Sequence, residues 1–389
     1  MSNASLLLDV LPYDFNTRGR KLAQALADAG PVAYLGLSSA GRLGLAVAAG
    51  ESKHGAIAVR HVKTRRIWER RTLLASIYNL VLAYAISGVR LAWRTLATPA
   101  ALVVVGNPAL LPLAWLHKRK HGSRIQFDAR ERPGGIRTAG SLATWVSRIE
   151  PWMFRAMAPA VDLVTTVCNT HAAEYAAFGF RHVVVVRNVP ALAPRRSRSQ
   201  IGLPLRFAYV GSLYSGRGLE SLLRAVAQAN AQRMICRLDV TGFASDGYLG
   251  ELKSLVTSLR VENAVAFRGP CSQSEVFARY FEADVACVLY EAVDAANNSL
   301  PNKLFESMAA GCAVLATNLP ETAEVVRTAR AGLAVDASPD SLAAAIRALA
   351  SDLTQTAMFG RNARTAHEVE LNWELEEAAY REAVDALRP

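Results

Sequence analysis

The sequence contains few cysteines and no paired-cysteine motif. Five cysteines are scattered over 389 residues without any C-x-x-C spacing, which disfavours a zinc ribbon and a disulfide framework. Their mostly apolar surroundings predict buried, reduced thiols. Met1 is not followed by a basic segment, a long apolar segment and a cleavage site, so we expect no secretory signal and a cytoplasmic protein.

An uninterrupted membrane-spanning stretch is also missing. The most apolar region, residues 67–97, has an uncharged core of 17 residues from Leu73 to Val89 that serine, asparagine and glycine dilute. A spanning helix needs about 20 predominantly apolar residues. A long helix packed in the first domain is the favoured interpretation. The alternative is a helix that lies on an anionic membrane through Trp68, Trp93 and its arginine-rich flanks.

Positive charge is concentrated in the first half of the chain. The formal net charge is +11; residues 1–190 hold 24 Lys and Arg against 10 Asp and Glu, and the remainder holds 20 against 23. A basic patch at residues 115–122 contains His117 and His121 without acidic or thiol partners, which predicts a solvated helix end rather than a metal site. The asymmetry predicts a surface for nucleic acid, anionic lipid or phosphorylated ligands, with an ordinary basic surface as the alternative.

Short apolar segments alternate with helical patterns along the chain. The composition, 51% hydrophobic and 20% charged, is that of a folded globular protein. Continuous apolar strands separated by helices predict parallel sheets covered on both faces, and hence an α/β fold of two Rossmann-like, doubly wound domains. Strands are expected at residues 6–11, 32–37, 102–106, 125–128, 163–167, 183–187, 206–210, 237–242, 265–269, 285–289 and 313–316, and helices at 18–29, 170–177, 219–231 and 273–283.

One segment, residues 189–205, interrupts this alternation with proline, serine and arginine. It predicts a linker at residues 191–204 between an N-terminal domain at 1–190 and a C-terminal domain at 205–365. Two tandem doubly wound domains are expected to bind ligands in a cleft at the carboxyl ends of their strands.

The strand expected at residues 206–210 is followed by a glycine-rich turn and a helix. Gly211 ends the strand, and Gly216 and Gly218 flank Arg217, but the spacing is not G-x-G-x-x-G; a dinucleotide fingerprint is therefore not supported. Glycines let backbone N–H groups approach a phosphate, the helix start adds a partial positive charge, and Arg217 adds a fixed cation. An ordinary turn with a surface arginine is the alternative.

A second polar loop precedes an expected helix in the stretch SLPNKLFESMAAGCAVLAT, residues 299–317. Pro301 delays the start of the helix, so the amides around Ser299–Lys303 are free to donate hydrogen bonds to an anion. Glu306 lies one turn inside the helix, where its carboxylate could accept from two sugar hydroxyls. The alternative is that the loop residues cap the helix and that Glu306 is an ordinary exposed residue.

This stretch resembles the donor-binding signature of the GT-B glycosyltransferases, most of all glycosyltransferase family 4. The signature has two glutamates separated by seven residues; the second falls on Glu306, and the first falls on Asn298, a departure from the usual acidic residue. YVGSLYSGRGLESLLRA, residues 209–225, is similar to the segment that binds the donor diphosphate, with Arg217 at the basic position. Ser212 stands where a second basic residue is common.

Other parts of the chain extend the resemblance. FDARERPG, residues 127–134, looks like a D-x-R-[DE] stretch of some bacterial members, and residues 366–389 resemble a C-terminal helix that crosses back to the N-terminal domain. For Asp128 an ion pair at a strand end is the alternative to a role as base. The resemblance implies donor-binding residues Gly211, Ser212, Gly216, Gly218, Asn298, Ser299, Leu300, Pro301, Asn302 and Glu306, and catalytic residues Arg217, Lys303, Asp128, Arg130 and Glu131.

The resemblance implies a glycosyltransferase that moves a sugar from a nucleoside-diphosphate sugar to a lipid-linked or membrane-proximal saccharide in bacterial glycan synthesis, with retention. Arg217, Lys303 and the loop amides would stabilise the leaving phosphate. No D-x-D occurs in the sequence, so we expect no metal and no other cofactor. The expected partners are the donor, the acceptor and an anionic membrane surface at the inner face of the cell membrane, contacted through the basic N-terminal domain.

Other functions remain open. A GT-B-type nucleotide-sugar epimerase would need no acceptor, and a binding protein that has lost transfer activity would account for Asn298 and Ser212. Nucleic acid is not an expected partner, because the sequence shows no recognition helix and no aromatic-studded sheet motif.

Overall fold

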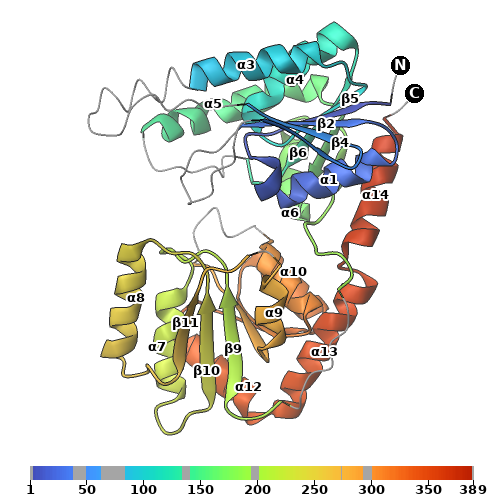
Figure 1. The fold of residues 1–389 in the computed structure, drawn as a ribbon. Coiled ribbons are helices and arrows are strands. Elements are labelled where there is room, and N and C mark those ends of the chain that lie inside the picture. The colour runs from blue at the N-terminus through green and yellow to red at the C-terminus, as the bar shows by residue number, and fades with distance from the viewer. Residues whose placement is uncertain are drawn as a thin grey trace. The chain divides into compact units, whose positions relative to one another are not determined.

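A computed structural model describes residues 3–37, 50–62, 84–133, 141–193, 201–272, 274–291 and 300–387. The chain forms two compact units. Unit 1 comprises Met1–Val186 with Glu377–Pro389, and unit 2 comprises Arg187–Glu376. Figure 1 shows that each unit is built around a sheet with helices packed against it.

Unit 1 contains an eight-stranded sheet in the order β3-β4-β2-β1-β5-β6-β7-β8. All neighbouring strands are parallel except the β3–β4 hairpin. The interior strands β1 and β5 are buried at every residue, as expected for parallel strands covered on both faces. The strands are β1 (Ser5–Leu8), β2 (Val32–Leu37), β3 (Gly50–His54), β4 (Ile57–Val62), β5 (Leu102–Val105), β6 (Arg124–Ala129), β7 (Leu163–Thr166) and β8 (Val183–Val185).

Helices cover both faces of this sheet. Side chains of α3, α4 and α5 pack into one hydrophobic cluster with Ile125 and Phe127 of β6. The opposite face of β6 carries Gln126, which bonds Tyr380 of α14, and Asp128, which pairs with Arg18 of α1. The helices are η1 (Tyr13–Phe15), α1 (Thr17–Ala27), α3 (Tyr84–Ala97), η3 (Pro108–Leu110), α4 (Leu111–His121), α5 (Ser141–Met157), η4 (Ala158–Ala160), α6 (Asn169–Ala177) and α14 (Trp373–Asp385).

Unit 2 contains a six-stranded parallel sheet in the order β11-β10-β9-β12-β13-β14. Numbered from its first strand, this is the order 3-2-1-4-5-6 of the doubly wound dinucleotide-binding fold. The strands are β9 (Leu205–Val210), β10 (Cys236–Thr241), β11 (Val265–Gly269), β12 (Val285–Val288), β13 (Ala313–Thr317) and β14 (Gly332–Val335).

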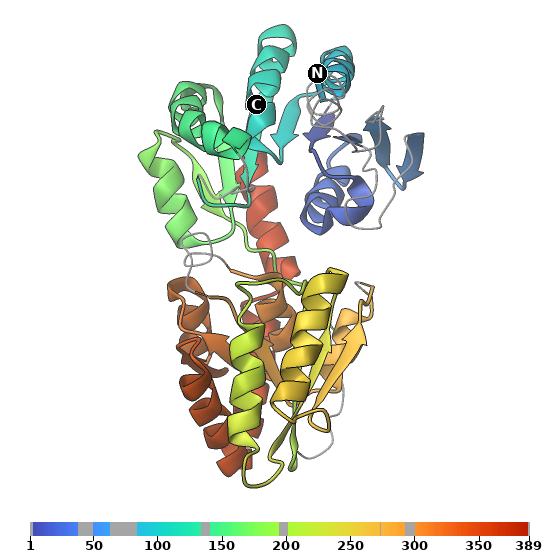
Figure 2. The same ribbon diagram turned by 90° about the vertical axis from the view of Figure 1, so that its left-hand side faces the viewer.

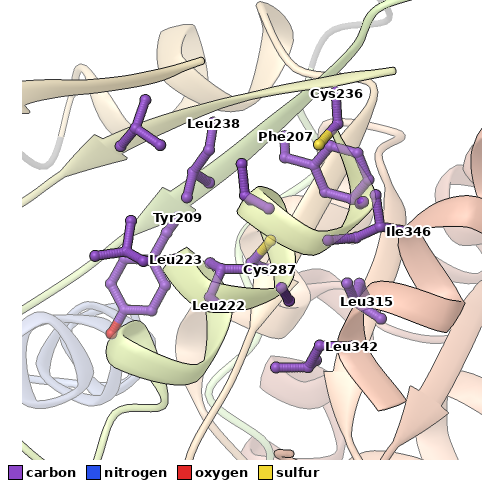
Figure 3. Close-up of a cluster of buried hydrophobic side chains, with 14 of the residues drawn as sticks. Phe207, Tyr209, Leu222, Leu223, Cys236, Leu238, Cys287, Leu315, Leu342 and Ile346 are labelled. Atoms are coloured by element: carbon purple, nitrogen blue, oxygen red, sulfur yellow. The ribbon is translucent and has the colours of Figure 1, made fainter. Parts of the chain in front are cut away.

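The core of unit 2 lies between this sheet and the helices α7, α8 and α12. Figure 3 shows the buried side chains that meet there, among them Phe207, Leu222, Leu238 and Ile346. Figure 2 shows α7 and α8 side by side along the sheet. The helices are α7 (Leu219–Ala229), α8 (Asp246–Ser258), α9 (Val276–Phe281), α10 (Asn302–Ala309), α11 (Pro320–Thr328), α12 (Pro339–Ser351) and α13 (Leu353–Val369).

The predicted α/β architecture with two doubly wound sheets is confirmed. Three strands were not predicted: β3, which is exposed along its whole length, its partner β4, and β14, which begins at a glycine. The segment 366–389, expected as one helix, holds the end of α13 and the whole of α14. The prediction for His117 is wrong, because its ring is buried and bonds Ser123 and the Thr98 carbonyl.

The cysteine prediction is confirmed, since all five thiols are free and only Cys271 is partly exposed. Most of the apolar region at residues 67–97 lies outside the described residues. Of the helices that the structure describes, none combines the length and the hydropathy that crossing a membrane requires.

Candidate functional site

The loops after β9 and β12 meet at the point in unit 2 where the strand order reverses. β9 is bonded to β10 on one side and to β12 on the other, so the two following loops leave the sheet in opposite directions. Ligands of open α/β sheets bind at this position, outside the carboxyl ends of the strands. Both predicted phosphate-binding segments of unit 2 begin beside it.

The glycine-rich turn after β9 packs directly on the chain that follows β12. Gly216 and Gly218 have φ of 87° and 69°, a left-handed conformation that favours glycine. A Cβ atom added to Gly218 would lie 3.1 Å from Cβ of Leu289. The amide of Glu291 donates a 2.9 Å hydrogen bond to the carbonyl of Gly216. The turn is thereby fixed against the segment that leads from β12 toward α10.

Arg217, at the tip of this turn, is held by aromatic rings. Its guanidinium carbon lies 4.2 Å from the ring centre of Tyr214 and 4.4 Å from that of Tyr290. Such cation–π contacts orient the guanidinium without consuming its hydrogen-bond donors. Among the described residues, no carboxylate forms an ion pair with Arg217. Its charge is therefore available to an anionic ligand.

Lys303, in the first turn of α10, approaches the same tyrosine. Its Nζ atom lies 4.3 Å from the ring centre of Tyr290 and 4.2 Å from that of Tyr209, and it donates a 3.3 Å hydrogen bond to the Leu289 carbonyl. Only 7% of the residue is exposed. Burial lowers the pKa of the Lys303 amine well below its ordinary value, and the positive charge of Arg217 lowers it further.

Tyr290 therefore links two basic groups that come from the two predicted phosphate-binding segments. Neither group has a carboxylate partner in the part of unit 2 that the structure describes, and an anion bound there would offset their mutual repulsion. Lys303 differs from its prediction in one respect: its amine faces the Leu289 carbonyl and two rings rather than solvent. The structure places it as a support beneath Tyr290, with Arg217 as the more accessible cation.

The buried amine of Lys303 should reduce the stability of the protein below the ordinary lysine pKa of 10.5. Between the lowered folded pKa and 10.5, the unfolded chain binds one more proton than the folded chain, so stability rises with pH in that interval. Lys303→Met keeps the length of the side chain and removes the titration. We expect Lys303→Met to raise Tm, and to raise it more at pH 7 than at pH 10, in thermal unfolding followed by circular dichroism.

The exposed Lys253 on α8 provides the matched control for that measurement. Lys253→Met should leave Tm nearly unchanged at both pH values. A drop in Tm for Lys303→Met at pH 7 would show instead that the contacts of the charged amine outweigh its burial.

The remaining predicted residues of unit 2 lie around these two segments. Gly211 follows β9, and its amide bonds the Thr241 carbonyl; the carbonyl of Ser212 accepts from the Tyr209 hydroxyl. Leu300 and Pro301 precede α10, and the side-chain oxygen of Asn302 accepts from Asn188. Asn298 and Ser299 lie outside the described residues.

Glu306 is half-buried, three residues after Lys303 on α10. Burial, and then the negative charge of Glu306, raise the pKa of the Tyr280 hydroxyl well above its ordinary value.

Unit 1 has a cavity of about 400 Å³ at the corresponding place in its own sheet. It is lined by the residues that follow β1, β5 and β6, and the strand order of unit 1 reverses between β1 and β5. Three residues predicted as catalytic line it, namely Asp128, Arg130 and Glu131, together with Arg132, Glu150 and Tyr175. Side chains of both signs of charge lie in a lining that is otherwise largely apolar.

Asp128 lies in a buried ion pair with Arg18, the alternative to a role as base that the sequence left open. Its carboxylate is only 2% exposed, accepts a bifurcated hydrogen bond from Arg18 Nε at 2.9 and 3.1 Å, and accepts another from Thr165. Arg130 Nε lies 3.5 Å from the same carboxylate. A carboxylate engaged in this way cannot readily abstract a proton from a ligand. The ion-pair interpretation is therefore the one that the structure supports.

Arg130 and Glu131 differ in their accessibility. Arg130 pairs with Asp9 and donates to the Gly106 carbonyl at 2.8 Å and to Asn16 at 3.0 Å. These bonds hold the carboxyl ends of β1, β5 and β6 together. Glu131 is exposed, and its backbone carbonyl accepts from Tyr175. Of the two predicted carboxylates in this cavity, that of Glu131 belongs to the more exposed residue.

Sequence reasoning missed Tyr290 and Asp9, which organise the two places described above. Each follows a buried strand directly or after a single residue, which is where ligand-contacting loops of parallel sheets begin. Their position just after a buried strand is the sequence signal that could have identified them. Their partners, Arg217 and Arg130, lie 73 and 121 residues away along the chain.

Comparisons with known proteins show what the chain is similar to. Residues 204–352 match the family described as glycosyl transferases group 1. None of the curated proteins is significantly similar to the sequence. The family match covers most of unit 2, and the fold of the whole chain is that of GT-B glycosyltransferases.

Solved structures of that class resemble the whole chain. Sucrose-phosphate synthase from Thermosynechococcus elongatus has a TM-score of 0.73 at 17% identity, covering 99% of both chains. Anabaena HepE in complex with UDP-glucose has a TM-score of 0.70 at 14% identity, covering 98% of this chain and 99% of that one. A trehalose-6-phosphate protein from E. coli, bound with UDP-2-fluoro glucose, has a TM-score of 0.69 at 13% identity, covering 99% and 98%.

Proposed function

We propose that this protein transfers a sugar from a nucleoside-diphosphate sugar to a lipid-linked or otherwise membrane-proximal saccharide in bacterial glycan biosynthesis. The observation that carries the proposal is the pair of basic groups, Arg217 and Lys303, held on Tyr290 where the strand order of unit 2 reverses. The similarity to structures solved with UDP and UDP-glucose supports a nucleotide-sugar donor.

The proposed chemistry follows from the charges that develop. Cleavage of the bond between the sugar and the diphosphate leaves negative charge on the phosphate, which a fixed guanidinium stabilises more in the transition state than in the bound donor. The backbone amides of Asn302 and Lys303, the first two of α10, precede the first hydrogen bond of the helix and add donors to the same phosphate. The absence of a D-x-D motif from the sequence favours a reaction without a metal. Retention of configuration is carried over from the family resemblance.

Glu306→Ala tests the donor site. The correct donor at about 100 times its Kd should stabilise the wild-type protein by about 2.7 kcal/mol, or a rise in Tm of roughly 5–10 °C for a domain of this size. Loss of the carboxylate that is proposed to hold the ribose should remove most of that rise and leave the ligand-free Tm unchanged. A thermal-shift panel of nucleoside diphosphates and their sugars measures both quantities.

The exposed Glu324 on α11 supplies the control, because it lies on a helix outside the proposed site. Glu324→Ala should retain the full ligand-induced rise. An undiminished rise in Glu306→Ala would remove Glu306 from the donor site. Conversion of the donor without any acceptor, with the sugar still attached to the nucleotide, would favour the epimerase.

A further inference from the structure

Three neighbouring helices of unit 1 direct apolar side chains into solvent. On α3, Val89 and Trp93 are 69% and 71% exposed; on α4, Leu116 is 46% exposed; on α5, Ile149 and Trp152 are 40% and 71% exposed. α3 packs beside α4, and α4 packs beside α5 (Figure 1). We call these five residues the three-helix surface. Exposed apolar patches of this kind mark interaction sites in folded proteins.

Helix periodicity shows that these side chains point away from the sheet. The opposite faces of the three helices carry Leu91, Ala114 and Phe154, which pack into one hydrophobic cluster with the strands of unit 1. Trp93 and Trp152 each lie two residues from one of these buried positions, about 200° around the helix. All three helices cover the same sheet face, so their outward residues lie on one side of unit 1.

The charges around the three-helix surface are almost all positive. Residues 84–121 contain no Asp or Glu, and α5 contains only Glu150, which is buried. Exposed cations flank the apolar residues on every helix: Arg90, Arg119, Lys120 and Arg155. Among the described residues, none of these four forms an ion pair with a carboxylate. They are therefore available to a negatively charged partner.

We propose that the three-helix surface binds an anionic lipid bilayer. Tryptophan is favoured at the boundary between headgroups and acyl chains, where aliphatic side chains such as Val89 and Leu116 also bury their apolar surface. Arginine and lysine around them attract anionic headgroups. A nucleic acid would use the cations and could stack on the tryptophans, but it offers no apolar environment for Val89, Leu116 and Ile149. This surface would bring the enzyme to the membrane-proximal acceptor of the proposed function, on which this inference rests, whichever donor the enzyme uses.

Vesicle sedimentation tests the proposal. The purified full chain is incubated with vesicles of phosphatidylcholine alone, or of phosphatidylcholine mixed with phosphatidylglycerol. We expect binding to the mixed vesicles only, weakened by salt. The double variant Trp93→Ser/Trp152→Ser should lower the affinity about tenfold or more, because binding scales with the apolar area that is buried. The variant Arg90→Ser/Arg119→Ser should lower it about fivefold for each cation removed.

Val369 provides a matched control, since it is 62% exposed at the end of α13 in unit 2. Val369→Ser should bind vesicles as the wild type does. Tm and the donor-induced thermal shift, measured for every variant, separate loss of membrane binding from loss of fold or of donor binding. Failure of the wild type to sediment with anionic vesicles would overturn the proposal. So would unchanged binding of the tryptophan variant, which would indicate that the cations alone attach the protein to the vesicles.

Discussion

Arg217→Ala is expected to lower kcat/KM by about 100- to 1000-fold, the loss usually seen when one preorganised group is removed from a developing negative charge. The guanidinium lies between the rings of Tyr214 and Tyr290, so it is oriented before a ligand arrives and loses little freedom when it binds. Most of the loss should appear in kcat, because the charge on the leaving phosphate is larger in the transition state than in the donor. Steady-state transfer or donor-hydrolysis assays measure it.

A large loss of kcat with a nearly unchanged Tm would distinguish a catalytic role of Arg217 from a structural one. Arg217 is at the surface end of a turn whose conformation is set by Gly216 and Gly218, so its truncation should barely alter Tm. Arg224, exposed on α7, is the control: Arg224→Ala should retain wild-type activity. Full activity of Arg217→Ala would show that the diphosphate lies elsewhere.

The architecture was largely predictable because it depends on local patterns. Buried parallel strands such as LVVV of β5 and VACV of β12 are continuous apolar runs, and the helices between them repeat every three to four residues. The exposed strand β3, with the sequence GESKH, carries no such pattern and was missed. Its position is set by pairing with β4 rather than by its own composition.

The candidate site was predictable only in part, for a different physical reason. The glycine turn and the start of α10 have local sequence signatures. No local signature shows which partner each side chain contacts in the folded protein. Nothing in the sequence indicates that Arg217 and Lys303 share the ring of Tyr290, or that Asp128 is paired with Arg18, 110 residues away. A carboxylate at the end of a strand has the same sequence signature whether it serves a ligand or an ion pair.

Asp128→Asn should therefore destabilise unit 1 strongly. Arg18 and Asp128 are both 2% exposed, and removing one charge leaves the other buried without its partner, which typically costs about 3–5 kcal/mol. Five of the six tryptophans lie in unit 1, so thermal unfolding followed by tryptophan fluorescence reports mainly on this unit. We expect a Tm well below that of the wild type, and near-wild-type transfer activity at a temperature where the variant is still folded.

Glu51 provides the control for Asp128→Asn within unit 1. Its carboxylate pairs with Arg60 at 3.0 Å but is 60% exposed, and exposed pairs contribute about 0–1 kcal/mol. Glu51→Gln should thus change Tm little. Replacing both buried partners, as Arg18→Met/Asp128→Leu, should recover much of the stability that Asp128→Asn loses, because no unpaired charge then remains in the interior. If Asp128→Asn instead keeps the wild-type Tm and loses activity, Asp128 acts on the substrate and the buried pair is not its main role.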